Sequence, residues 1–150
     1  MNDPLENSRG PVQITAGEWR GWTFWQGDSY EAQSGPFYYR PDSHGRIRCA
    51  FRAEQKHING SRAVHGGCIL TFADYTLFTI ALPYLGQDRT VTVSLTGDFA
   101  GSAHEGDLIE SNGEVVKMGG SLIFLRGIVE TQSRPIMNFS GILKKIRPEM

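Results

Sequence analysis

A single acidic residue, Asp74, lies in the middle of the most apolar stretch of the sequence, residues 66–82. The spacing of the apolar residues predicts a helix that is apolar on nearly its whole circumference and is therefore buried. On such a helix Asp74 neighbours Leu70, Leu77 and Phe78, so its carboxylate points into apolar surroundings. Buried carboxylates are costly and are often functional. Two interpretations stay open: a catalytic carboxylate, or an aspartate that hydrogen-bonds across a subunit interface or reaches solvent.

The start of the same predicted helix carries His65, Gly66 and Gly67. The first amides of a helix have no partner within it, so they can donate to a developing negative charge. Glycine lets a ligand approach the backbone closely, and one amide aimed at a carbonyl oxygen stabilises an oxyanion by roughly 3 kcal/mol. A Gly-Gly pair also marks ordinary turns, and a histidine at this position can simply cap the helix.

Asp74 and Gly66 cannot act on the same carbonyl group from one chain. Their separation of eight residues corresponds to about 12 Å along a helix axis, whereas a base or nucleophile must come within about 3 Å of the reacting group. Two antiparallel copies of the helix, related by a two-fold axis, would bring Asp74 of one chain to Gly66 of the other. If both residues are catalytic, the site is shared and the protein is at least a dimer.

The rest of the chain predicts a sheet that would position this helix. A hairpin over 37–51 and a polar loop over 53–65 precede the helix. Alternating apolar residues predict strands near 90–99, 107–118, 121–131 and 135–146. These elements predict one α+β domain in which an antiparallel sheet covers a buried helix.

The N-terminal residues lack this pattern. Residues 1–17 are polar and have no hydrophobic period, which predicts a mobile arm. Trp19, Trp22 and Trp25 recur every three residues, which would place them on one side of a short helix. A stacking platform for bases needs a positively charged groove, and only Arg20 is near. We therefore favour tryptophans that seal a core edge or a subunit contact.

Composition excludes several classes of protein. The 150 residues carry 15 Lys and Arg against 16 Asp and Glu, a net charge of −1, so we expect neither nucleic acid nor a membrane surface as partner. Cys49 and Cys68 lack metal-ligand spacing and are typical of thiols in a reducing compartment. The N-terminus has no signal-peptide pattern, and no 18 apolar residues run together as in a membrane span. We expect a cytoplasmic protein.

Two segments together, 57–67 (HINGSRAVHGG) and 72–74 (FAD), resemble the hotdog-fold acyl-CoA thioesterases. The branch is that of the phenylacetyl-CoA (PaaI-like) and mammalian THEM-type enzymes, in the 4-hydroxybenzoyl-CoA thioesterase superfamily. The specific feature is the combined spacing, with Asn59 six residues before His65 and Asp74 nine residues after it.

This resemblance covers roughly residues 35–146. It implies a hotdog fold, in which an antiparallel sheet wraps one long central helix. We therefore divide the chain into an N-terminal arm with a Trp-rich segment, 1–34, and a hotdog thioesterase domain, 35–150. The arm departs from the short members of the family.

The resemblance also implies catalytic roles. Asp74 would act as general base for water or as nucleophile on the thioester carbonyl. The Gly66 amide would polarise that carbonyl, and the Asn59 side chain would orient the water or the substrate.

Three further positions match residues that lie beside the substrate in the family. His65 and Gly67 would lie next to the thioester, and Thr92 would help to hold the water. Family members take the residues around the helix start from one subunit and those matching Asp74 and Thr92 from the other. The resemblance therefore implies a homodimer, or a tetramer built from two dimers.

The implied substrate is an acyl-CoA, with no metal or other cofactor, because a thioester is already electrophilic and its thiolate leaves readily. Two alternatives stay open: an acyl-thioester dehydratase or hydratase, and a non-catalytic acyl-CoA-binding module. The phosphates of CoA would attract basic side chains. The candidates are Arg62, Arg89, Arg126 and Arg134, and we expect His44, His57 and His104 at the surface.

Overall fold

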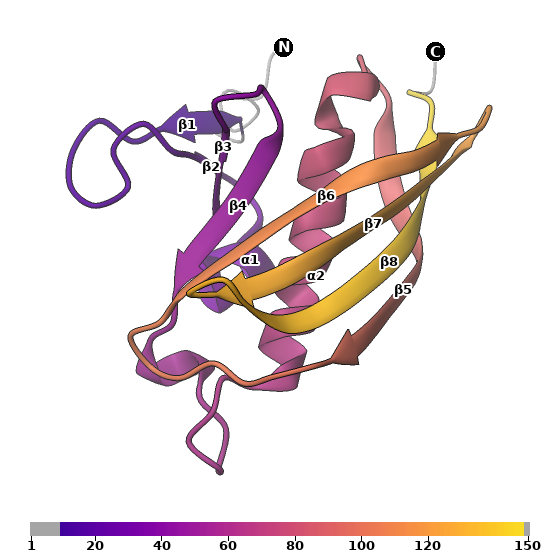
Figure 1. Cartoon of the computed structure of the whole chain (residues 1–150). Coiled ribbons are helices and arrows are strands. Elements are labelled where there is room, and N and C mark those ends of the chain that lie inside the picture. The colour runs from indigo at the N-terminus through magenta and orange to yellow at the C-terminus, as the bar shows by residue number, and fades with distance from the viewer. Residues whose placement is uncertain (1–9, 149–150) are drawn as a thin grey trace.

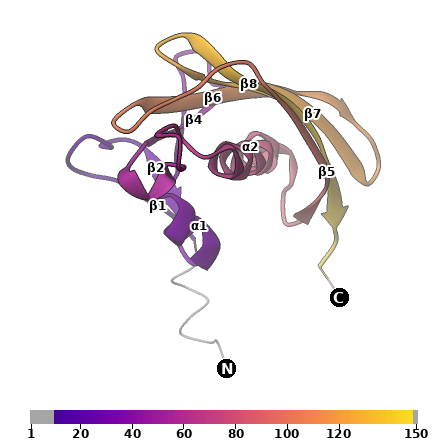
Figure 2. The same ribbon diagram turned by 90° about the horizontal axis from the view of Figure 1, so that it is seen from below.

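The computed structural model describes residues 10–148, which form one antiparallel sheet that curves around a single long helix (Figure 1). The helix is α2 (Gly66–Ala81), and the view in Figure 2 shows the sheet arching over it. The order across the sheet is β1-β2-β3-β4-β6-β7-β8-β5. The strands are β1 (Pro11–Gln13), β2 (Thr23–Trp25), β3 (Tyr38–Pro41), β4 (Ile47–Arg52), β5 (Arg89–Phe99), β6 (Leu108–Met118), β7 (Leu122–Thr131) and β8 (Arg134–Ile146). The predicted α+β architecture is confirmed.

Helix α2 forms where the apolar stretch predicted it. His65 is its N-cap, and the 3-10 helix η3 (Leu82–Tyr84) follows at Pro83, which cannot continue an α-helix. Phe72 and most of the other α2 side chains are buried beneath the sheet. By length and composition alone, Gly66–Tyr84 is apolar enough for a membrane span, but half of it is buried inside the protein, as is typical of a core helix.

Two glycines let the sheet lie close to α2. A Cβ atom on Gly113 of β6 would come within 2.9 Å of Ile80 Cδ1, and one on Gly141 of β8 would collide with the Leu77 side chain. A larger residue at either position would force the neighbouring strand or the α2 side chains to move, because protein interiors are close-packed.

The N-terminal segment joins the sheet. Strand β1 pairs with β2 from Pro11 to Gln13, and β2 pairs with β3 through Thr23 and Tyr39. The expected mobile arm is therefore wrong for its described part, while residues 1–9 lie outside the described residues. The division at residue 34 stays a prediction.

The three tryptophans do not share a helix. Trp19 lies in a turn, where it stacks on Tyr38 at 4.1 Å between ring centroids and meets Trp22 edge-on at 5.4 Å. Trp25 lies in β2 and packs edge-on against Phe78 of α2 at 5.7 Å. The rings pack at the edge of the core, as favoured, but a turn and a strand position them.

His57, expected at the surface, is 4% exposed, whereas His44 and His104 are exposed as predicted. His57 Nδ1 accepts from the Glu54 amide at 2.9 Å. Nε2 therefore carries the proton and donates to the Ser34 carbonyl at 2.6 Å. The ring therefore ties the loop before α2 to the end of helix α1 (Ser29–Ser34).

We expect His57→Ala to lower the free energy of unfolding by about 2–4 kcal/mol. The Glu54 amide and the Ser34 carbonyl would both lose a partner, and each unsatisfied buried group costs about 1–3 kcal/mol. Urea unfolding measures the change. His44→Ala, at an exposed position, is the control and should shift stability by no more than about 0.5 kcal/mol. Equal stability of the two variants would contradict the assigned role.

Candidate active site

Asp74 and Thr92 are hydrogen-bonded to each other. The Thr92 hydroxyl, on β5, donates to Asp74 Oδ1 on α2 at 2.6 Å, a length typical of a bond to an ionised carboxylate. No described residue donates to Oδ2. One carboxylate oxygen is therefore fixed, and the other is available to water or a ligand.

Asp74 lines two cavities of about 340 Å³ and 250 Å³. Leu70 lines the first and Phe78 the second, as the predicted apolar surroundings required. Both cavities also receive Asp28 and Glu31 from the N-terminal segment. The expectation of purely apolar neighbours is therefore wrong, because it considered only residues on the same helix.

Sequence reasoning missed this acidic wall. Asp28 is the N-cap of α1, and its Oδ1 accepts from the Glu31 amide at 2.9 Å. Burial, followed by the charges of Asp28 and Asp74, raises the pKa of Glu31 to about 7. An acceptor at the N-cap followed by Glu three residues later is a known helix-start signal. The signal is weak in this sequence because no apolar period follows it.

The start of α2 presents one free amide. His65 Nδ1 accepts from the Gly67 amide at 2.8 Å, so this histidine caps the helix and Gly67, a predicted substrate contact, already has a partner. The Gly66 amide donates to no described residue. The exposed ring of Phe99, at the end of β5, lies 3.2 Å from where a Cβ atom on Gly66 would stand.

Asn59 shapes the loop in front of α2. Its Oδ1 accepts from the Ser61 amide at 2.9 Å and the Ala63 amide at 3.1 Å. The side-chain NH₂ group remains for another partner. Asn59, Gly66 and Phe99 line a common cavity of about 220 Å³.

The predicted site residues thus form two groups within one chain. Asn59 and Gly66 line one cavity, and Asp74 lines others, one of them with Thr92. None of these cavities contains both Asp74 and Gly66. Within residues 10–148, no group of three His, Cys, Asp or Glu side chains is arranged to hold a metal ion.

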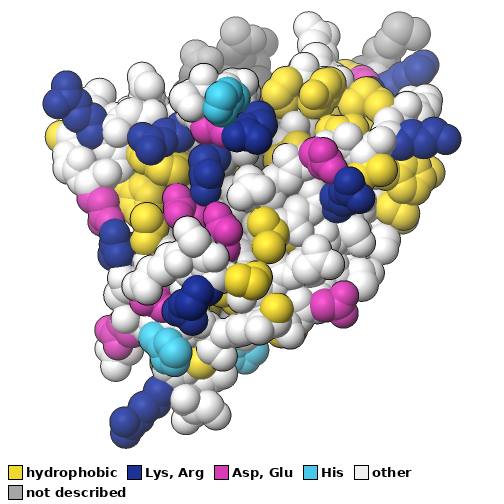
Figure 3. Space-filling view, viewed as in Figure 1, with side chains coloured by type: hydrophobic (Ala, Val, Ile, Leu, Met, Phe, Trp, Pro, Cys, Tyr) yellow, Lys and Arg dark blue, Asp and Glu magenta, His cyan; other side chains and the backbone are white. Residues whose placement is uncertain are grey.

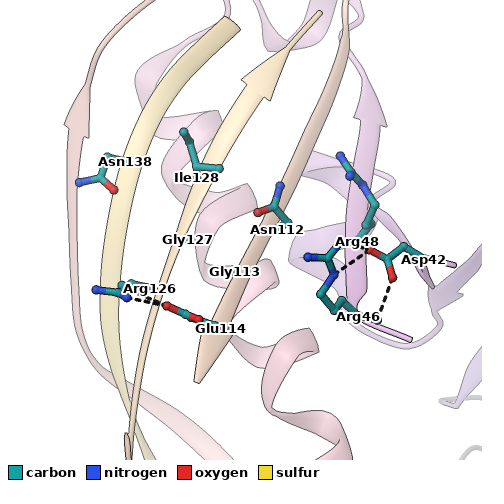
Figure 4. A pocket seen from close by; sticks show the side chains of 10 residues that line it. All are labelled: Asp42, Arg46, Arg48, Asn112, Gly113, Glu114, Arg126, Gly127, Ile128 and Asn138. Atoms are coloured by element: carbon teal, nitrogen blue, oxygen red, sulfur yellow. Dashed lines mark hydrogen bonds and ion pairs between the residues drawn. The ribbon is translucent and has the colours of Figure 1, made fainter. Parts of the chain in front are cut away.

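A larger cavity, about 440 Å³, lies on the outer face of the sheet and contains none of these residues (Figure 4). Its arginines are paired: Arg46 lies 3.0 Å from Asp42, and Arg126 lies 2.7 Å from Glu114. Arg126, a candidate for the CoA phosphates, is therefore on the side of the sheet opposite α2. Figure 3 shows acidic and basic side chains close together over this face, with hydrophobic ones at its upper right, near the turn between β6 and β7, and in smaller groups at its left and centre.

One long helix under a curved antiparallel sheet is the hotdog fold, and solved structures share it. Zebrafish thioesterase superfamily member 2 matches with a TM-score of 0.70 and 18% identity, over 81% of this chain and 89% of that one. BH2602 from Bacillus halodurans, solved with CoA, matches with a TM-score of 0.69 and 19% identity, over 74% of each chain. These identities establish the fold alone.

The sequence comparisons establish the family. Residues 62–137 match the family model of the Thioesterase superfamily. A Pseudomonas aeruginosa protein named "Putative esterase PA0474" is 33% identical over 109 residues, which are 72% of this chain and 81% of that protein. The chain belongs to the thioesterase superfamily and is a thioester hydrolase. The family match includes Gly66, Asp74 and Thr92 and begins after Asn59.

Proposed function

We propose that this hydrolase cleaves acyl-CoA thioesters to a free acid and CoA, with Asp74 as the catalytic carboxylate. The hydrogen bond between Thr92 and Asp74 carries the proposal, since it fixes one carboxylate oxygen and leaves the other open to a cavity. The CoA in the structure of BH2602, which has the same fold, supports acyl-CoA as the substrate class.

The reaction needs a base and an oxyanion donor. As general base, Asp74 takes a proton from water while the water oxygen bonds to the carbonyl carbon, and the Gly66 amide stabilises the developing oxyanion. Collapse of this intermediate breaks the C–S bond, and the proton held by Asp74 passes to the departing thiolate. As nucleophile, the Asp74 carboxylate would bond to the carbonyl carbon and expel CoA as its thiolate, forming a mixed anhydride that water then hydrolyses to the free acid and the original carboxylate. Both routes use the same two groups.

Three other residues complete the proposed site. Thr92 positions Asp74 by donating to it. The NH₂ group of Asn59 is free to orient water or the thioester carbonyl. His65 uses Nδ1 to cap the helix, so Nε2 is the atom left for substrate contact.

The site is shared between two protomers in this proposal. Strand β5 lies alongside α2. Thr92, in the first half of β5, contacts Asp74, and Phe99, at the end of β5, lies over Gly66. An antiparallel pairing of two β5 strands, about an axis near Leu95, would bring Asp74 of one protomer close to Gly66 of its partner.

The free edge of β5 suits such a pairing. Strand β5 stands at one end of the sheet, with β8 as its neighbour. It exposes apolar side chains, with Val91 46% and Val93 57% accessible. Long apolar edge strands are normally covered. A second copy covering this edge would give the proposed dimer, and two such dimers would give a tetramer.

A free-thiol assay tests the function. We expect CoA release from a series of aromatic, short-chain and long-chain acyl-CoAs, with matched acyl-pantetheine thioesters showing how much the nucleotide contributes. A protein that binds acyl-CoA and returns it intact is a binding module. Addition of water to an enoyl-CoA without thiol release would indicate a hydratase.

A further inference from the structure

Helix α1 lies against the side of α2 that the sheet leaves open (Figure 2). The Tyr30 hydroxyl lies 3.3 Å from Thr71 Oγ1 of α2. No residue of α1 is fully buried, although Glu31 is partly buried, and the cavities of about 340 Å³ and 250 Å³ remain between this segment and α2. The segment thus forms a wall beside Asp74 without filling the space.

Glu31 is the residue of α1 that lines both cavities together with Asp74. Asp28 lines them too, but one of its oxygens is occupied in capping α1. The Glu31 carboxyl group forms no ion pair or hydrogen bond with a described side chain. It is therefore the free polar group of this wall.

The ionisable groups that face Glu31 are all acidic. Neither cavity is lined by Lys, Arg or His. The facing groups are Asp28 and Tyr30 around the start of α1, and Asp74 and Tyr75 of α2. Together with burial, the acidic surroundings raise the pKa of Glu31 to about 7, so both of its forms are populated near neutral pH.

We propose that Glu31 determines specificity, admitting an uncharged acyl chain to the space beside Asp74 only when its own carboxyl group is protonated. The inference rests on the proposed function, because an acyl group whose carbonyl is held at Asp74 can extend into the cavities that Asp74 lines. An acyl chain there displaces the water around Glu31. Removing water from a carboxylate costs far more than removing it from the neutral acid.

The raised pKa of Glu31 sets the expected pH dependence of acyl-chain binding. Below about pH 7 Glu31 is protonated and a long acyl chain binds. Above about pH 7, each further pH unit lowers the fraction of protonated Glu31 about tenfold. For a long neutral acyl group, kcat/KM should fall through a rise in KM. An acetyl group is too short to fill the cavities and is the reference substrate.

The test compares octanoyl-CoA with acetyl-CoA between pH 6 and 8.5. Their kcat/KM ratio cancels every pH effect that acts equally on both substrates, including the ionisation of the CoA phosphates. We expect the wild-type ratio to fall about 30-fold over this range, as one ionisation near pH 7 requires. In Glu31→Gln, which resembles the protonated acid, the ratio should stay constant.

Asp28→Asn is the matched variant. The amide oxygen of the substituted side chain would still cap α1, but the loss of charge lowers the pKa of Glu31, so the ratio should begin to fall at a lower pH. A wild-type ratio that changes less than threefold, or a fall that persists in Glu31→Gln, would overturn the inference.

A binding measurement distinguishes failure of the role proposed for Glu31 from failure of the proposed function. Calorimetry with S-octyl-CoA, a thioether that cannot be hydrolysed, should show the same pH-dependent affinity in wild type and its loss in Glu31→Gln. Failure to hydrolyse any acyl-CoA would refute the proposed function. A pH-independent affinity for S-octyl-CoA in a protein that does hydrolyse octanoyl-CoA would refute only the role of Glu31.

Thermal unfolding gives a further expected result. The folded protein holds the Glu31 proton up to about pH 7, whereas the unfolded chain releases it near pH 4.5. Stability is therefore lost as pH rises between these values and stays reduced above them. The gain in Tm from Glu31→Gln should be larger at pH 8 than at pH 5. An equal gain at both values would place Glu31 in ordinary solvated surroundings.

Discussion

Asp74→Asn should reduce kcat about 10²- to 10⁴-fold, the usual contribution of a positioned base, which corresponds to about 3–5 kcal/mol in the barrier. The amide cannot accept a proton from water at neutral pH and is a poor nucleophile. The fold should be preserved, because the amide oxygen can still accept from the Thr92 hydroxyl, as Asp74 Oδ1 does at 2.6 Å. Thiol release measures the loss, and thermal unfolding checks the fold.

Glu105→Gln is the control for this variant. It removes one negative charge from an exposed loop residue, outside the cavities described above. If it were as inactive as Asp74→Asn, the loss would reflect net charge and substrate attraction rather than a base. Wild-type turnover in Asp74→Asn would remove the aspartate from the mechanism.

The sheet and its helix could be predicted because their residues carry strong local patterns. Alternating apolar residues placed the strand near 107–118 where Leu108–Met118 lies, and that near 135–146 where Arg134–Ile146 lies. Helix α2 was predictable from its apolar circumference and from Pro83. Such patterns report which face of an element is buried, and burial decides the fold.

The N-terminal segment could not be predicted in the same way. Strand β1 spans only Pro11–Gln13, too few residues for an alternating pattern. The three-residue spacing of the tryptophans imitates a helix, although Trp19 and Trp25 are held by Tyr38 and Phe78, far away in the sequence. Their positions depend on tertiary contacts, which local periodicity does not contain.

The candidate site was only partly predictable, because residue spacing does not show which side chains of other elements face a residue. The spacing of Asn59, His65 and Asp74 identified residues that lie at cavities or at the start of α2, but not what else faces them. The polar sequence neighbours of His57 predict an exposed residue, yet its partner, Ser34, comes from another element. Glu31 lines the same cavities as Asp74 because α1 lies beside α2. Side chains from separate elements meet only once the fold brings them together.

Mixing two inactive chains should restore activity if the site is shared. One chain carries Asp74→Asn and the other Gly66→Pro, which removes the amide donor at the first position of α2. Proline is well accepted there, because His65 before it already has the extended conformation, φ −60° and ψ 132°, that a residue preceding proline prefers. Gly66→Ala is the control, since it keeps the amide and makes the same close contact with Phe99.

A heterodimer of these chains contains one complete site and one site lacking both groups. Purified through two different affinity tags, it should have about half the activity of a wild-type dimer, whereas each homodimer should lose about 10²- to 10³-fold or more. The reverse pairing, wild type with a chain carrying both substitutions, should be inactive as a heterodimer, because each of its sites lacks one group. If the site lay within one protomer, these results would be exchanged: the first heterodimer would be inactive and the second half active. The two pairings contain the same substitutions in different arrangements, so their difference measures whether Asp74 acts with Gly66 of its own chain or of its partner.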